Sequence, residues 1–142
     1  MEKIVDVAKY ISKKYHTEKG CLIDQMKLHK ILFFIQKESF SRLQKEMFKE
    51  DFEGWKLGPV CIEIRRKFGW IKKFDDEVYL EDENKKIIDF IYDKYKDINS
   101  YELSRLSHLE YSWIKSRLGI QDGENGNVVI SKRDIYEDAM DQ

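Results

Sequence analysis

The sequence contains few of the residues that would mark a secreted, metal-binding or membrane-spanning protein. It has two cysteines, Cys21 and Cys61, and no C-x-x-C motif. This scarcity argues against a disulfide framework or a zinc knuckle and indicates a reducing compartment. No apolar run approaches the roughly 18 residues that a membrane span needs, and the N-terminus has no signal-peptide core. We therefore expect a cytoplasmic protein that does not enter a membrane.

The sequence also lacks a strong net charge. Its 142 residues carry a formal net charge of −1, so no overall basic field favours binding to nucleic acid. Hydrophobic residues make up 42% and aromatic residues 13% of the chain, which is too much for a disordered protein. A chain of this length fits one domain, and we assign residues 1–142 to a single domain.

The only proline, Pro59, lies in the segment Phe-Glu-Gly-Trp-Lys-Leu-Gly-Pro-Val at 52–60. Proline fits the first turn of a helix, and apolar residues follow at i, i+4 and i+8 from Val60. The residues before it are aromatic and favour a strand. The segment therefore predicts a short strand, a tight Gly-Pro turn and a helix.

The rest of the chain predicts an α+β, mainly helical domain. Residues 24–43 form the expected centre, because the middle of this segment is apolar on every side and Asp24 can cap its start. About seven helices should surround or extend this buried helix. A small two- or three-stranded sheet should pack on the helices, with short strands near 52–56, 77–80 and 127–131.

No set of residues forms a complete catalytic or metal-binding motif. His108 and Glu110 have the H-x-E spacing of zinc deaminases, but the P-C-x-x-C half of that motif is missing. Cys61 has apolar neighbours and is expected to be a buried structural thiol. His29 is expected to be a partly buried helix residue. We therefore predict no catalytic residues, no metal and no cofactor.

The segment from Ser107 to Trp113 has a different character. It places two hydroxyl groups, an imidazole, a carboxylate and two aromatic rings in seven residues between two predicted helices. A corner of this kind can satisfy backbone groups, or it can form a recognition surface. The sequence leaves both interpretations open.

Four segments of the sequence resemble the Panacea domain, the family of SocA-like antitoxins that includes phage-associated proteins. They are Val-Ala-Lys-Tyr-Ile at 7–11, Met-Lys-Leu-His-Lys-Ile-Leu-Phe-Phe at 26–34, the segment 52–60, and Leu-Ser-Arg-Leu-Ser-His at 103–108 with Trp113. The second is similar to the family's LKLQKLLYFAQ, the third to FEAWKYGPV and the fourth to LSELTHKEGPWK. The sequence has His29 where the family often has glutamine, and Ser112 where it has the proline before the tryptophan.

This resemblance implies a single-domain antitoxin that neutralises a co-encoded protein toxin by direct binding. Clustered aromatic and polar groups at the two corners are the expected partner-binding residues: Trp55, Lys56, His108, Glu110 and Trp113. The toxins of the family are of unrelated kinds, so the resemblance does not identify this one. Two alternatives stay open, namely a proteolytic adaptor that delivers the toxin to a protease, as SocA does, and a hydrolase that uses His108 and Glu110.

Overall fold

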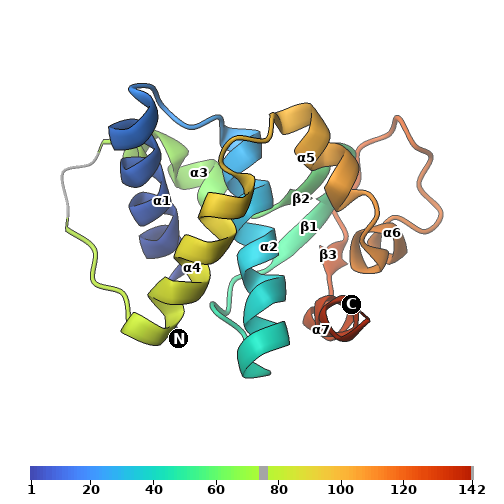
Figure 1. Cartoon of the computed structure of the whole chain (residues 1–142). Helices are drawn as coiled ribbons and strands as arrows, with labels where there is room; N and C mark the ends of the chain where they lie inside the picture. The colour runs from blue at the N-terminus through green and yellow to red at the C-terminus, as the bar shows by residue number, and fades with distance from the viewer. Residues whose placement is uncertain (74–76, 142) are drawn as a thin grey trace.

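The computed structural model describes residues 1–73 and 77–141 of the chain. Within these residues it contains seven helices and one three-stranded antiparallel sheet (Figure 1), which confirms the predicted fold class. The elements in chain order are α1 (Ile4–Lys19), α2 (Gln25–Leu43), β1 (Phe52–Trp55), β2 (Gly58–Val60), α3 (Ile62–Ile71), α4 (Asp82–Tyr95), α5 (Ser100–Ser107), α6 (Tyr111–Ser116), β3 (Val129–Ile130) and α7 (Lys132–Met140). In this part of the chain, no helix has the length and apolar character that crossing a membrane would require.

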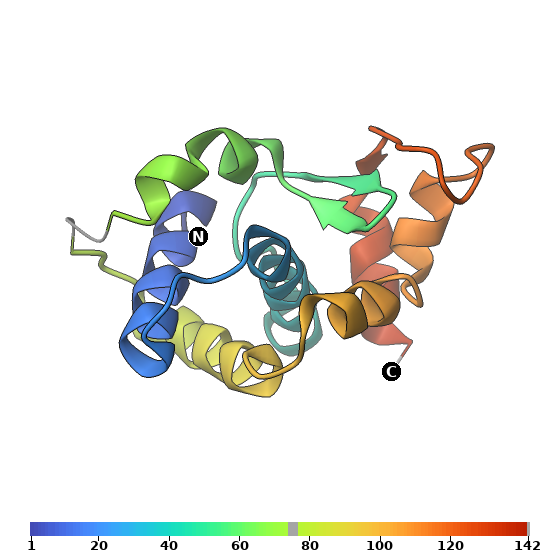
Figure 2. The same cartoon turned by 90° about the horizontal axis from the view of Figure 1, so that it is seen from above.

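Helix α2 lies at the centre of the molecule, as its apolar middle predicts. In Figure 2 it is surrounded by α1, α3 and α4 on one side and by α5, the sheet, α6 and α7 on the other. Asp24 caps the helix, since its side chain accepts a hydrogen bond from the backbone N–H of Lys27 at 3.2 Å. Ile31, Leu32 and Ile35 are fully buried. The middle of the helix is therefore buried on all sides, as an apolar helix segment in the core of a domain must be.

The sheet has the strand order β2-β1-β3 and packs on α2. Gly54 lies opposite Pro59, and Phe52 lies opposite Ile130. The ring of Phe52 meets the ring of Phe33 from α2 edge-on, with 5.6 Å between the centroids. This contact joins the central strand to the central helix, so the hairpin of β1 and β2 has a fixed position in the fold.

The predicted Gly-Pro turn and the helix start at Pro59 are wrong. Lys56 and Leu57 form the turn, Pro59 lies in β2, and α3 begins only at Ile62. Strand β2 is at the edge of the sheet. Proline is tolerated there because the N–H that it lacks can face away from the neighbouring strand.

The predicted strand at 77–80 is also wrong. These four residues form neither a helix nor a strand, and the sheet of the described residues does not include them. The alternating side chains that suggested a strand alternate in burial only, because Leu80 is 6% exposed whereas Tyr79 is 83% exposed. The predicted strand near 127–131 is confirmed but is shorter, since β3 comprises Val129–Ile130.

Candidate partner-binding site

Two of the segments that carry the family resemblance, 52–60 and 103–108 with Trp113, meet at one corner of the molecule. The indole N–H of Trp113 in α6 donates to the backbone carbonyl of Trp55 at 2.9 Å. The hydroxyl of Ser104 in α5 donates to the carbonyl of Leu57 in the hairpin turn, also at 2.9 Å. Two helices that are distant in sequence from the hairpin therefore hold its turn by hydrogen bonds to its carbonyl groups.

Gly58 allows α2 and α5 to approach the hairpin closely. Its φ of 131° lies in a region that residues with a side chain rarely adopt. A Cβ atom at this position would lie 2.8 Å from Oγ of Ser107 and 3.0 Å from Cε of Lys30. Both the backbone conformation and the close contacts therefore require glycine where β2 begins.

Gly54 has the same function in the middle of β1, where α6 packs against the strand. A Cβ atom there would lie 1.9 Å from Oγ of Ser116. The guanidinium of Arg117, which follows α6, donates to the carbonyl of Gly54 at 3.0 Å. A strand glycine often marks such an approach of another backbone. It brings α6, and with it Trp113, against the hairpin.

His29 joins α2 to the end of β2. It is 1% exposed, so it is more buried than the sequence suggests. Its Nδ1 accepts a hydrogen bond from the backbone N–H of Cys61 at 3.2 Å, and its Nε2 lies 3.2 Å from Oε1 of Gln25. This pattern requires the proton on Nε2. Burial, together with the nearby cations Lys30 and Arg65, lowers the pKa of His29 to about 4.

Cys61 is buried, as predicted, and is unsuited to nucleophilic chemistry. It is 1% exposed, and burial raises the pKa of its thiol to about 11. A thiol needs its thiolate form to attack an electrophile. At neutral pH the side chain therefore stays protonated and acts as a small apolar group in the core.

His108 and Trp113 form a stacked pair beside the hairpin turn. Their ring centroids are 4.0 Å apart and the rings are inclined by only 10°. Nε2 of His108 is buried and forms no hydrogen bond within the described part of the chain. Burial lowers the pKa of His108, and the positive charges of Lys30 and Arg117 lower it further. The imidazole is therefore neutral near pH 7.

A groove opens next to this pair. Its volume is about 450 Å³, and the lining residues are Lys56, Leu57, His108, Trp113, Arg117, Asp122 and Gly123. Leu57 is 50% exposed at the tip of the hairpin. The groove thus combines an exposed apolar tip, a stacked aromatic wall and more cationic than anionic side chains, which suits recognition of another protein better than an apolar small molecule.

The structure brings three of the five expected binding residues into this groove. Lys56, His108 and Trp113 line it. Trp55 contributes its backbone carbonyl, whereas its indole N–H donates to Oε1 of Glu53 at 2.9 Å. Its ring also lies 4.9 Å from the guanidinium of Arg65 in α3. The Trp55 side chain therefore belongs to the neighbouring outer face of the sheet.

Glu110 is separated from the groove by its own contacts. Its Oε1 lies 2.7 Å from Nζ of Lys37 in α2, and both side chains are largely buried. Burial raises the pKa of Glu110, although Lys37 acts in the opposite direction, and Asp138 of α7 raises it as well. No hydrogen bond joins Glu110 to His108 within the described residues. The pair that the hydrolase hypothesis needs is therefore not assembled.

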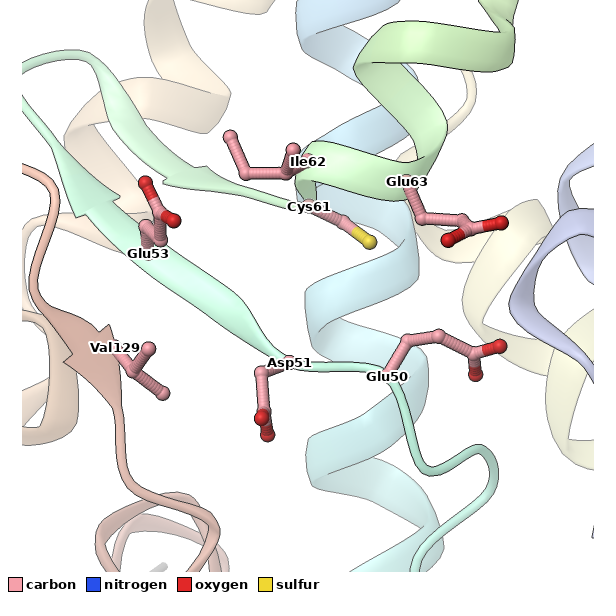
Figure 3. A pocket seen from close by; sticks show the side chains of 7 residues that line it. All are labelled: Glu50, Asp51, Glu53, Cys61, Ile62, Glu63 and Val129. Atoms are coloured by element: carbon pink, nitrogen blue, oxygen red, sulfur yellow. The ribbon is translucent and has the colours of Figure 1, made fainter.

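A second, acidic pocket lies on the other side of the hairpin (Figure 3). Its volume is about 220 Å³, and it is lined by Glu50, Asp51, Glu53, Cys61, Ile62, Glu63 and Val129. Figure 3 shows that the carboxylates of Glu53 and Asp51 point in opposite directions, whereas those of Glu50 and Glu63 both point to the other side of the pocket. In the part of the chain that the structure describes, no three His, Cys, Asp or Glu side chains are placed to hold a metal ion.

Sequence reasoning missed two residues near the groove, Lys30 and Arg117. Lys30 falls within segment 26–34, directly before the apolar middle of the predicted central helix. That position is a signal that could have identified it, because lysine is almost never fully buried without a reason. Arg117 carries no comparable signal, since its position depends on how α6 packs against β1.

Residues 28–114 match the family model of the antitoxin SocA-like Panacea domain. This range covers more than half of the chain, from α2 to α6, and contains the hairpin, the His108–Trp113 pair and Lys30. No curated protein and no solved structure matches the chain.

Proposed function

We propose that this protein, which belongs to the family of SocA-like antitoxins with a Panacea domain, is the antitoxin of a toxin–antitoxin pair. It neutralises a co-encoded toxin by direct binding, and it acts in the cytoplasm. The observation that supports this proposal best is the convergence of two family-like segments, 52–60 and 103–108 with Trp113, around one groove. Such convergence is expected when the segments serve a shared surface.

The groove and its rim are the surface that we assign to the toxin. Leu57 at the hairpin tip is half exposed, and the neighbouring helix α6 and its end present Tyr111, Ile114 and Leu118 at 55%, 45% and 75% exposure. Exposed apolar groups near an aromatic wall are typical of protein interfaces. Lys56, His108 and Trp113 line the groove, and the toxin is masked by the contact itself.

Occlusion of this kind needs contact area and no proton transfer. The separation of His108 from Glu110 supports a binding role over the hydrolase alternative. A proteolytic adaptor would use the same toxin contact and would need a further surface for the protease. The lifetime of the toxin in cells distinguishes the two modes, since only an adaptor shortens it.

The test is co-expression with the product of the adjacent gene, read out as growth, together with the affinity of the purified proteins. Leu57→Asp places a charge at the exposed hairpin tip, where it disturbs the fold little. We expect it to weaken binding by at least tenfold and to restore toxicity, because a charge in an apolar contact must be desolvated.

Leu22→Asp is the matched control. Leu22 is 48% exposed, close to the 50% of Leu57, and it lies in the loop between α1 and α2, outside the groove. We expect this variant to bind as the wild type does. Equal behaviour of the two variants would disprove the assigned surface, and a wild-type protein that does not bind the adjacent gene product would disprove the function.

A further inference from the structure

The central helix contains a buried lysine that forms no hydrogen bond or salt bridge among the described residues. Lys30 is 1% exposed, and Asp24 is the anion that favours its charge electrostatically. Lys27, one turn earlier, is also buried, yet its Nζ donates to the carbonyl of Lys96 at 2.8 Å. Burial lowers the pKa of Lys30 to about 8, so most molecules keep the charge at pH 7.

The positive charge of Arg117 forms no ion pair with a described residue. The residue is 6% exposed, and its guanidinium donates to the carbonyls of Gly54, Gln121 and Glu124. These acceptors are neutral, so they satisfy the N–H groups and leave the charge in place. Arg117 lines the groove, as does the exposed Lys56.

The position of Lys30 places its charge behind the groove wall. Its Cε packs beneath Gly58 at the end of the hairpin turn, beside Ser107. His108, the residue after Ser107, lines the groove, and the charges of Lys30 and Arg117 both lower its pKa. Two carboxylates oppose the three cations: Asp122, which lines the groove, and Asp24, which acts on Lys30. The described residues therefore leave an excess of positive charge at the groove.

A buried charge destabilises a free protein when its desolvation outweighs the attraction of nearby anions, as it does for Lys30 beside Asp24. We propose that the groove binds a carboxylate side chain of the toxin, an Asp or Glu, attracted by the excess positive charge of Lys30, Arg117 and Lys56. This inference rests on the proposed function. The stacked rings of His108 and Trp113 and the exposed Leu57 supply apolar contacts for the methylene groups next to that carboxylate.

Lys30→Met tests the inference, because it keeps the length and apolar stem of the side chain and removes the charge. We expect the free variant to have a higher Tm than the wild type and to bind the toxin at least tenfold more weakly. A residue that serves only the fold would behave differently, since its replacement would lower the Tm and leave the affinity unchanged. Either a lower Tm or an unchanged affinity overturns the inference.

Lys27→Met is the matched control on the same helix. Its loss removes the hydrogen bond to the Lys96 carbonyl, so the Tm should fall while the affinity for the toxin stays the same. A rise of the Tm in Lys30→Met and a fall of the Tm in Lys27→Met would show that the Lys30 charge serves binding and the Lys27 charge serves stability. A loss of affinity in both variants would overturn the assignment to Lys30.

A second measurement uses small probes and does not depend on the toxin. N-acetylaspartate amide should shift the NMR signal of the His108 ring saturably in the wild-type protein, and N-acetylasparagine amide should not. The shift should be lost in Lys30→Met. If a short DNA duplex shifts the signal and the aspartate probe does not, the groove binds phosphate and the carboxylate assignment is overturned.

The two measurements separate the failure of this inference from the failure of the proposed function. A wild-type protein that binds the toxin, with Lys30→Met binding equally well, leaves the function intact and overturns the carboxylate site. If the wild-type protein does not bind the toxin but its His108 signal responds to the aspartate probe, the carboxylate site is supported and the antitoxin role is refuted.

Discussion

His29 should make the stability of this protein strongly dependent on pH. Its pKa is lowered to about 4 in the folded protein by burial and by Lys30 and Arg65, with Asp24 acting in the opposite direction. The unfolded chain has the ordinary value of about 6.5. Between these two values the unfolded chain binds a proton that the folded protein does not bind. The free energy of unfolding therefore falls as the pH falls from about 6.5 to about 4.

The size of this effect follows from the shift of about 2.5 pH units. One unit corresponds to about 1.4 kcal/mol, so the full loss from His29 is about 3.5 kcal/mol. Most of it appears early, because between pH 7 and pH 5 the expected loss is already about 2 kcal/mol. Such a loss is a large part of the stability of an ordinary domain.

His29→Gln isolates this contribution from all other titrating groups. Glutamine does not titrate, its Oε1 can still accept the hydrogen bond from the Cys61 N–H, and it is the residue that the family pattern has at this position. Urea unfolding at pH 7, 6 and 5 should show that the wild type loses about 2 kcal/mol more than the variant. Parallel pH profiles for the two proteins would refute the argument that His29 is buried and neutral.

Two further predictions concern packing. Gly54→Ala should lower the free energy of unfolding by about 1–3 kcal/mol, because the new Cβ would lie 1.9 Å from Oγ of Ser116. Adding Ser116→Ala to this variant should recover part of the loss. If the free-energy changes of the two substitutions simply add, the two residues are not in contact. Leu32→Ala in the centre of α2 should cost about 2–5 kcal/mol in the same denaturation assay, and a change below about 0.5 kcal/mol would show that this helix is peripheral.

The helices and their ends could be predicted because their signals are local. Gly20 ends α1 with a left-handed φ of 73°, and Asn99 and Ser131 cap α5 and α7 by accepting from backbone N–H groups. These features depend on neighbours in sequence, so the pattern alone identifies them. The predicted helix 24–43 agrees with α2 for the same reason.

The hairpin shows where local signals fail. A proline fits both the first turn of a helix and an edge strand, and only the position of β1 decides between them for Pro59. The turn residues Lys56 and Leu57 are not the Asn-Gly or Asp-Gly pair that marks a tight hairpin. Their conformation is supported by distant groups, such as the hydroxyl of Ser104 that donates to the Leu57 carbonyl.

The candidate site was predictable in its residue types and less so in its arrangement. His108 and Trp113 were expected, and they are stacked in the groove. The sequence could not show that strand geometry directs the Trp55 indole to the outer face of the sheet. Nor could it show that Lys37, which is distant in sequence, forms an ion pair with Glu110 and removes it from the groove.

The polar residues of α2 give the strongest reason to treat Lys30 as functional. His29 accepts a hydrogen bond from the Cys61 N–H, Gln36 is bonded to the Phe48 carbonyl and the Met47 N–H, and Ser39 donates to the Lys45 carbonyl. Each of these buried groups is matched to the backbone around it. The helix therefore does not tolerate unpaired polar groups in general. Lys30 differs from them, since at 1% exposure its ammonium has the attraction of Asp24 and no hydrogen bond among the described residues. A further anion for this ammonium is best sought outside this chain, in the protein that covers the groove.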